Sequence, residues 1–290
     1  MIEIKELVKT YSNLRGLKGI SFNLNNGEIL GLVGNNGAGK STLMKVLMTF
    51  LKVDSGQILL DGVNVFENRE FLLDKSAAVI ENMGFYKELT GYEHLKMIKS
   101  IRGISDEDFN EILEFVDIGG AFKRRTSTYS LGMKQRLAVA IALLSSKEIL
   151  VLDEPTNGLD QKSIIRLIKL LRKYRDRGYS ILISSHTLAD LEELCDRFVF
   201  LDNGNIINEL DRSEINIDTY NFNIREDLSE SHIKLFQGNY DKENNLIIST
   251  EENLSNTINK LITNNIKINS VERENNNLKK IYLDYFEGDK

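Results

Sequence analysis

The chain has 290 residues and a mass of 33.1 kDa, which predicts one large domain, or one domain with a smaller appendage. With 41% hydrophobic and 28% charged residues, its composition is globular and excludes global disorder. The net charge of −6 argues against a nucleic-acid partner, and no apolar run reaches the roughly 18 to 20 residues that span a bilayer. The single cysteine and the charged N-terminus, which lacks a signal peptide, predict a cytoplasmic protein.

The composition changes near position 210. The last 80 residues carry 10 basic and 15 acidic side chains, so they hold most of the net charge of −6. We therefore predict two domains, residues 1–210 and residues 211–290, the second being a small acidic α+β module. Its expected strands are 219–224, 246–249 and 267–271, and its expected helices are 254–263 and 278–286. The module has no motif, and regulation, dimer support, permease contact and simple stabilisation all remain open.

Short apolar strands alternate with helices in the first 210 residues. We expect early strands at 1–8 and 19–24, with a hairpin turn at Asn25-Asn26-Gly27. Further expected strands are 28–33, 148–153 and 179–184, and expected helices are 130–145, 163–177 and 188–195, followed by a hairpin around 202–204. Residues 82–128 have a helical, amphipathic pattern. This alternation predicts an α/β fold with a largely parallel core sheet.

A glycine-rich loop follows the strand at 28–33 and precedes a helical pattern. Its sequence matches Gly-x-x-x-x-Gly-Lys-Ser, the Walker A pattern that cradles nucleotide phosphates with backbone N–H groups. The lysine reaches the β- and γ-phosphates, the serine hydroxyl is a ligand of Mg²⁺, and the next threonine lies near the α-phosphate. The predicted ATP-binding residues here are Gly34, Asn35, Asn36, Gly37, Ala38, Gly39, Lys40, Ser41 and Thr42.

Two carboxylates end the strand at 148–153. Asp153 fits a Walker B aspartate that holds Mg²⁺ through water, and Glu154 can polarise the water that attacks the γ-phosphate. A solvated carboxylate pair at a strand end would be the plain alternative. The upstream glycine loop favours the catalytic interpretation, because the carboxyl ends of parallel strands share one edge of a sheet.

The order of the motifs resembles the ATP-binding subunits of ABC transporters. After the glycine loop come Tyr-Ser-Leu-Gly-Met-Lys-Gln-Arg at 129–136, Ile-Leu-Val-Leu-Asp-Glu-Pro-Thr-Asn-Gly-Leu-Asp at 149–160, and Ser-Ser-His at 184–186. The resemblance covers residues 1–210. It implies a P-loop NTPase fold with an N-terminal antiparallel sheet and a helical subdomain at about 82–128. It also implies ATP hydrolysis, with Mg²⁺, coupled to transmembrane transport.

The resemblance assigns further residues by position. Tyr11 matches the aromatic side chain that stacks on adenine, and His186 matches the switch histidine that contacts the γ-phosphate. Ser130 and Gly132 match the signature motif, which closes over ATP bound by the opposite subunit, and Asp160 matches the D-loop aspartate. The implied catalytic residues are Glu154, His186 and Lys40. The implied assembly is a homodimer across ATP, held at the inner face of the membrane by separate permease subunits.

The sequence departs from the general family pattern at three positions. Leu131 and Met133 replace the first glycine and the glutamine of the signature motif. Glu81 stands where the family has its Q-loop glutamine, so it adds a negative charge near Mg²⁺ and the triphosphate. A carboxylate there could bind the metal directly or repel the γ-phosphate. We therefore place Glu81 with Ser41 and Asp153 among the candidate metal ligands.

The stretch 80–95 and the modified signature resemble the bacitracin-resistance and lantibiotic-immunity ABC ATPases. This similarity implies an exporter of antimicrobial peptides. An ABC ATPase that exports another drug, a lipid or a polysaccharide is the main alternative. A non-transport ABC protein acting on ribosomes or DNA is a further alternative, but it usually needs two fused ATPase domains or a coiled-coil insertion, and the sequence contains neither.

Overall fold

The computed structural model describes residues 1–11, 15–81, 84–215, 217–225, 228–236, 240–241, 246–250 and 253–287. Two compact units divide the chain, Met1–Arg212 and Ser213–Lys290. Each unit combines strands and helices, and the predicted α/β class is confirmed. Among the described residues, no helix has the length and apolar character needed to cross a membrane.

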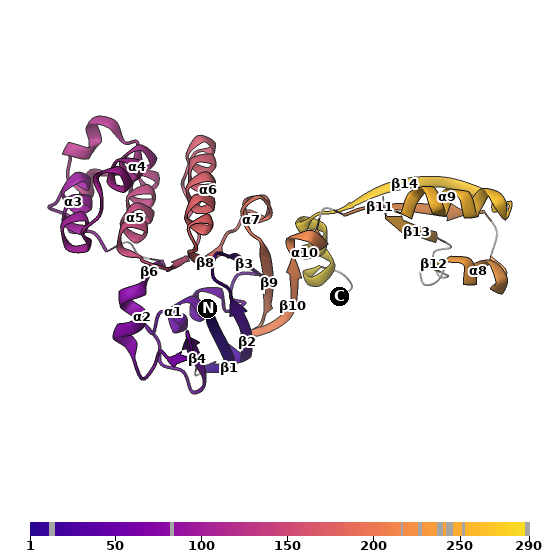
Figure 1. Cartoon of the computed structure of the whole chain (residues 1–290), viewed down its shortest axis with the longest axis horizontal. Helices are drawn as coiled ribbons and strands as arrows, with labels where there is room; N and C mark the ends of the chain where they lie inside the picture. The colour runs from indigo at the N-terminus through magenta and orange to yellow at the C-terminus, as the bar shows by residue number, and fades with distance from the viewer. Residues whose placement is uncertain are drawn as a thin grey trace. The chain divides into compact units, whose positions relative to one another are not determined.

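The first unit contains a four-stranded antiparallel sheet in the order β2-β1-β4-β5 (Figure 1). Its strands are β1 (Ile2–Thr10), β2 (Gly16–Leu24), β4 (Ser55–Leu60) and β5 (Val63–Asn64). The predicted turn at 25–27 forms, but the predicted hairpin is wrong, because the next strand, β3 (Ile29–Val33), belongs to the other sheet. All five residues of β3 are buried, and such a strand needs neighbours on both edges and both faces.

The second sheet has six strands in the order β10-β9-β3-β8-β7-β6. Its other strands are β6 (Ser76–Val79), β7 (Ile149–Leu152), β8 (Ser180–Ser184), β9 (Arg197–Asp202) and β10 (Asn205–Asp211). All pairings are parallel except that of β9 with β10, which form the predicted hairpin. The carboxyl ends of β3, β8, β7 and β6 therefore meet at one edge of the sheet.

Helix α1 (Lys40–Leu47) joins the two sheets into one core. Its side chains, such as Met44, pack in one cluster with Ile4 of β1 and Leu30 of β3, all almost completely buried. The other helices of this part are α2 (Arg69–Lys75), α6 (Gln161–Asp176) and α7 (Leu188–Leu194). Because α1 packs against strands of both sheets, the position of the loop that precedes it is fixed.

The predicted helical region at 82–128 contains two α-helices, α3 (Gly91–Arg102) and α4 (Asp106–Val116); residues 82 and 83 lie outside the described ranges. The short 3₁₀ helices η1 (Gly119–Lys123) and η2 (Thr126–Thr128) lead to α5 (Leu131–Ser145), which contacts both α3 and α4. Thr90 and Glu93 form a capping box that fixes the start of α3. Figure 1 shows α3, α4 and α5 gathered beside one another.

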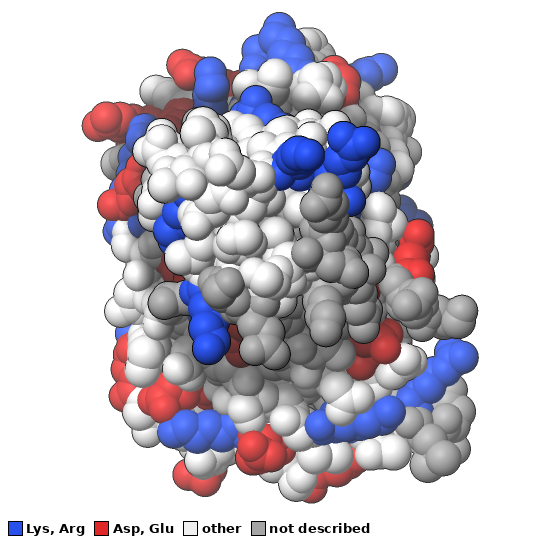
Figure 2. Space-filling model, turned by 90° about the vertical axis from the view of Figure 1, so that its right-hand side faces the viewer, with Lys and Arg blue, Asp and Glu red and all other residues white. Residues whose placement is uncertain are grey.

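The second unit is a four-stranded antiparallel sheet in the order β12-β13-β11-β14. Its elements are β11 (Ile217–Ile224), α8 (Glu230–Phe236), β12 (Tyr240–Asp241), β13 (Leu246–Thr250), α9 (Leu254–Thr263), β14 (Ile268–Asn276) and α10 (Leu278–Phe286), and η3 (Arg212–Glu214) precedes them. The predicted helices at 254–263 and 278–286 are confirmed, whereas α8 was not predicted. Figure 2 shows acidic and basic side chains interspersed among uncharged ones, a pattern typical of a solvated surface.

Candidate functional site

The glycine loop lies between β3 and α1, as the sequence predicts. Gly37 and Gly39 have φ angles of 85° and 114°, a left-handed backbone conformation that glycine adopts without steric cost. Gly39 is also the N-cap residue of α1, which leaves the first N–H groups of the helix without side-chain partners from the cap. The loop and the helix N-terminus therefore present backbone donors suited to phosphate oxygens.

Lys40 lies folded back over this loop. Its Nζ donates hydrogen bonds to the carbonyl oxygens of Gly34 at 2.6 Å and Asn35 at 3.1 Å, and only 9% of the residue is exposed. Burial lowers the pKa of Lys40, while the carboxylates of Glu154 and Asp153 act in the opposite direction. The ammonium group is thus already beside the loop, where phosphate oxygens can replace the two carbonyl acceptors.

Asp153 connects three elements at the edge of the parallel sheet. Its Oδ2 accepts a hydrogen bond from the Ser41 hydroxyl of α1 at 2.7 Å. Its Oδ1 accepts one from the Ser184 hydroxyl at the end of β8 at 2.6 Å. Ser184 is a site residue that we did not single out from the sequence, although its place at a strand end beside His186 was a usable signal. These bonds fix both oxygens of the carboxylate.

Glu154 and His186 form a second pair at the same edge. The Oε2 atom of Glu154 lies 2.6 Å from Nε2 of His186, and their side chains are 29% and 56% exposed. The backbone N–H of Glu154 donates to the Ser184 hydroxyl at 3.0 Å, and its carbonyl accepts from Nε2 of Gln135 at 3.2 Å. With φ of 51°, Glu154 has a left-handed backbone that these bonds hold in place.

Glu81 lies two residues beyond the end of β6 and pairs with a residue that the sequence did not suggest. Its Oε1 lies 2.7 Å from Nζ of Lys45 on α1. In this structure Glu81, a candidate metal ligand, therefore forms an ion pair with Lys45. The other two candidate ligands, Ser41 and Asp153, bond each other directly. No sequence signal pointed to Lys45, because the ion pair joins elements 36 positions apart.

The residues of the signature and D-loop motifs begin two helices. Ser130 is the N-cap residue of α5, and Asp160 is the N-cap residue of α6, where its Oδ1 accepts from the Ser163 N–H at 2.8 Å. The hydrogen bonds from Ser163 lower the pKa of Asp160. A Cβ atom on Gly132 would lie 2.5 Å from the carbonyl oxygen of Gly158, so glycine is required for this close approach. The two motifs thus lie against each other within one chain.

Tyr11 follows β1 and is 39% exposed. Its backbone N–H donates to the carbonyl of Arg15 at 2.8 Å, and Nζ of Lys9 lies 5.9 Å from its ring centroid. Residues 12–14, between the two hydrogen-bonded positions, lie outside the described ranges. An exposed ring of this kind is available for stacking on a base.

The oxygen atoms of Ser41 and Asp153 fit Mg²⁺, a small hard cation that prefers oxygen ligands. Within the described ranges, no three His, Cys, Asp or Glu side chains gather as a metal cage. Mg²⁺ usually keeps several waters and takes only one or two protein oxygens together with substrate phosphates, and Ser41 and Asp153 offer such oxygens. The residues present are therefore compatible with a metal that arrives with ATP.

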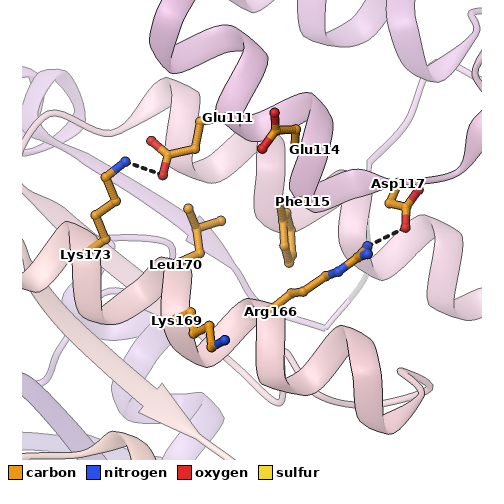
Figure 3. A pocket seen from close by; sticks show the side chains of 8 residues that line it. All are labelled: Glu111, Glu114, Phe115, Asp117, Arg166, Lys169, Leu170 and Lys173. Atoms are coloured by element: carbon orange, nitrogen blue, oxygen red, sulfur yellow. Dashed lines mark hydrogen bonds and ion pairs between the residues drawn. The ribbon is translucent and has the colours of Figure 1, made fainter.

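Two of the hollows in the described part of the chain lie on or beside the helical region, outside this site. One, of about 550 Å³, lies between α4 and α6, where Lys173 pairs with Glu111 and Arg166 pairs with Asp117 (Figure 3). Its charged side chains are thus largely engaged with one another. The other hollow, of about 340 Å³, lies between β6 and α5, and most of its lining residues have apolar side chains. It is lined by Phe50, Ala77, Ala78, Val79, Ile80, Gly84, Phe85, Ala138, Ile141, Ala142 and Ser145.

Known proteins are similar to this chain in both sequence and fold. A family model described as ABC transporter matches residues 17–157. The lantibiotic transport ATP-binding protein SrtF of Streptococcus pyogenes is 39% identical over 219 residues, which cover 74% of this chain and 93% of that protein. The bacitracin transport ATP-binding protein BcrA of Enterococcus faecalis is 38% identical, over 74% of this chain and 70% of that protein.

Solved structures of ATP-binding cassettes have a fold similar to that of this chain. The ATP-binding subunit of an ABC transporter has a TM-score of 0.67 and 30% identity, covering 73% of this chain and 90% of that chain. An ATP-binding cassette solved as a dimer in a post-hydrolysis state with ADP and Pi has a TM-score of 0.64 and 26% identity, covering 73% of this chain and 99% of that chain.

Proposed function

We propose that this chain, which belongs to the ABC transporter family of ATP-binding proteins, hydrolyses ATP to drive export of lantibiotic- or bacitracin-type peptides. One observation gives the main support for ATP binding and hydrolysis. Ser41, Asp153, Glu154 and His186 meet at the carboxyl edge of one parallel sheet, beside the loop that presents backbone donors. The names of the relatives support the peptide class.

ATP binding uses donors that the loop already holds in place. The N–H groups of the glycine loop and the N-terminus of α1 receive the phosphates, and Lys40 exchanges its two carbonyl acceptors for phosphate oxygens. Ser41 and Asp153 would hold Mg²⁺, Ser41 through its hydroxyl and Asp153 through water. The exposed ring of Tyr11 stacks on adenine.

Hydrolysis relies on the pair of Glu154 and His186. The Glu154 carboxylate orients the attacking water and accepts its proton, and His186, whose Nε2 lies 2.6 Å from that carboxylate in this structure, turns toward the γ-phosphate when ATP is bound. The bond that the Glu154 N–H donates to the Ser184 hydroxyl, and the bond that its carbonyl accepts from Gln135, keep the carboxylate at this position. Bound Mg²⁺ would neutralise charge that develops on the phosphate oxygens.

The complete site requires two copies of the chain. Each copy has one glycine loop and one signature motif, so Ser130 and Gly132 of one protomer cover the ATP held by Lys40 of its partner. Asp160 lies at the same interface. Leu131, next to Ser130, is 57% exposed, as expected of a residue that a second subunit covers.

ATP-dependent dimerisation can be tested with Glu154→Gln, which preserves shape but removes the base. We expect this variant to elute as a dimer in gel filtration with Mg-ATP and as a monomer without nucleotide. The double variant Glu154→Gln/Lys40→Ala serves as the matched control and should stay monomeric. A Glu154→Gln variant that remains monomeric with Mg-ATP would count against the shared site.

The apolar hollow between β6 and α5 is the proposed seat of a separate permease. Phe50, which is 53% exposed, and Phe85 contribute to its lining, and Glu81 lies just before Gly84 in the same segment. A cytoplasmic segment of the permease that inserts apolar side chains here would contact both the ATP edge and the helical region. This contact would hold the chain at the inner face of the membrane.

The transported substrate is tested by deleting the gene and measuring sensitivity to a panel of lantibiotics and bacitracin. We expect increased sensitivity to at least one peptide, reversed by the wild-type chain but not by the Glu154→Gln variant. Unchanged sensitivity to all of them would contradict the peptide assignment. It would favour export of another drug, a lipid or a polysaccharide.

A further inference from the structure

Helix α1 presents two polar side chains to two neighbouring strand ends. Ser41 and Lys45 are four residues apart and therefore lie on one face of the helix, one turn from each other. Ser41 donates to Asp153 at 2.7 Å, and Lys45 pairs with Glu81 at 2.7 Å.

The two acidic residues are also neighbours through the backbone. Asp153 directly follows β7, and Glu81 follows β6, the strand paired with β7. The N–H of Asp153 donates to the carbonyl of Val79 at 2.8 Å. Two carboxylates at one sheet edge thus meet successive turns of one helix, the first through a hydroxyl and the second through an ammonium group.

The ion pair with Lys45 offsets the negative charge that Glu81 adds near the glycine loop. A carboxylate near a triphosphate adds a like charge, and the repulsion grows as the site loses water. Glu81 has a φ of 55°, so its backbone is fixed in the left-handed region, and its side chain is 54% exposed. The Lys45 side chain is 29% exposed, and its Nζ lies 2.7 Å from Oε1 of this carboxylate.

We propose that Lys45 is a positioning residue that holds the Glu81 carboxylate one helical turn behind the Ser41–Asp153 pair and offsets its charge. A glutamate can then occupy this loop without weakening triphosphate binding. The inference rests on the proposed function, because it assumes that the loop before α1 binds ATP.

The test compares Lys45→Met, Glu81→Gln and the double variant in the full chain. ATP affinity is measured in EDTA with a fluorescent ATP analogue, so the readout does not depend on the loaded enzyme. We expect Lys45→Met to weaken binding about three- to tenfold, because Glu81 loses its counter-charge. Adding Glu81→Gln should restore the affinity to within about twofold of the parent chain.

A matched control separates this pairing from a general loss of positive charge. Lys52 is exposed and lies beyond the end of α1, and Lys52→Met should leave ATP affinity unchanged. The melting temperature of Lys45→Met should stay close to that of the parent chain, since exposed ion pairs contribute little stability.

Two outcomes would overturn the inference. One is that Lys45→Met weakens binding equally with and without the accompanying Glu81→Gln substitution, and the other is unchanged affinity in Lys45→Met. Lys40→Ala distinguishes failure of the inference from failure of the proposed function. If Lys40→Ala abolishes ATP binding while Lys45→Met has no effect, only the inference fails. If Lys40→Ala binds ATP as tightly as the parent, the proposed ATP site itself is wrong.

Discussion

The two compact units differ in what constrains their side chains. In Met1–Arg212, polar groups at the sheet edge bond one another, and the two oxygens of Asp153 accept hydrogen bonds from α1 and from β8. In Ser213–Lys290, a small apolar core consists of the buried side chains Phe222, Ile224, Phe236, Ile247 and Leu261. The chemistry of a binding site requires a particular residue at each position. A small apolar core requires only that its residues be apolar and suitably spaced in the sequence. Variants in the two units should therefore change different observables.

The largest effect is expected from Asp153→Asn. Asparagine keeps the shape of the side chain but loses the charge, and its NH₂ group would face a hydroxyl that now donates to the carboxylate. We expect Mg-ATP hydrolysis to fall by about 100-fold or more. Asp202→Asn, at the end of β9 on the same sheet, is the control and should retain most activity. If Asp153→Asn and Asp202→Asn lost ATP hydrolysis to a similar extent, the special role of Asp153 at the sheet edge would be contradicted.

The next effect concerns the second unit. Leu261 is 1% exposed in α9, whereas the adjacent Ile262 is 69% exposed. Leu261→Ala should lower the free energy of unfolding of this unit by about 2–5 kcal/mol, because it opens a cavity in a small core. Ile262→Ala should change it by less than about 0.5 kcal/mol.

Thermal melting and ATP turnover are measured on both α9 variants. Turnover should be unchanged in each of them if the second unit only supports the protein. A strong loss of turnover in Leu261→Ala at a temperature where the unit stays folded would give the second unit a direct part in catalysis.

A smaller effect is expected from the ion pairs between α4 and α6 (Figure 3). Glu111 pairs with both Lys173 and Arg177, and its side chain is 23% exposed. Glu111→Gln should lower the free energy of unfolding by about 1 kcal/mol at low ionic strength, and the difference should shrink in 1 M salt. Glu114→Gln, one turn further along α4, is the control. A difference that persists in high salt would point to packing rather than charge.

The smallest effect is an expected absence of change at Cys195. This cysteine is fully buried in the first unit, and burial raises the pKa of its thiol, which suppresses the reactive thiolate. Thiol–disulfide exchange with an added disulfide reagent should therefore require unfolding of the first unit, and Leu261→Ala should leave its rate unchanged. The rate is measured with a chromogenic disulfide reagent in increasing urea. Faster labelling of Leu261→Ala in buffer would show that the two units unfold together.

The sequence predicted the site better than it predicted the elements around it. The positions of Lys40, Ser41, Asp153, Glu154 and His186 followed from motifs whose chemistry demands particular residues, and the structure brings them to one sheet edge. Their catalytic roles remain predictions until the variants are measured. Lys45 was missed because its partner is distant in sequence and no local pattern marks it. Gln135 lies within the signature motif at 129–136, but its bond to the Glu154 carbonyl was not predicted.

Elements without strong periodicity were harder to predict. Strand β6, Ser-Ala-Ala-Val, is short and made of small residues, so its sequence has little strand character until it pairs with β7. The same applies to β4, β5 and α2, for which we made no prediction. The Asn25–Gly27 turn has the local sequence of a hairpin, but the burial of β3 places that strand in the other sheet. Local turn chemistry thus could not specify which sheet the chain enters.

The most direct test of the account is steady-state ATP hydrolysis by the purified chain with Mg²⁺, compared between the wild type and Glu154→Gln. We expect a loss of about 10²- to 10⁴-fold with nucleotide binding retained, because the variant removes the general base but keeps the loop and the Ser41–Asp153 pair. Equal hydrolysis rates in the two proteins would contradict the central claim that Glu154 at this sheet edge activates the attacking water.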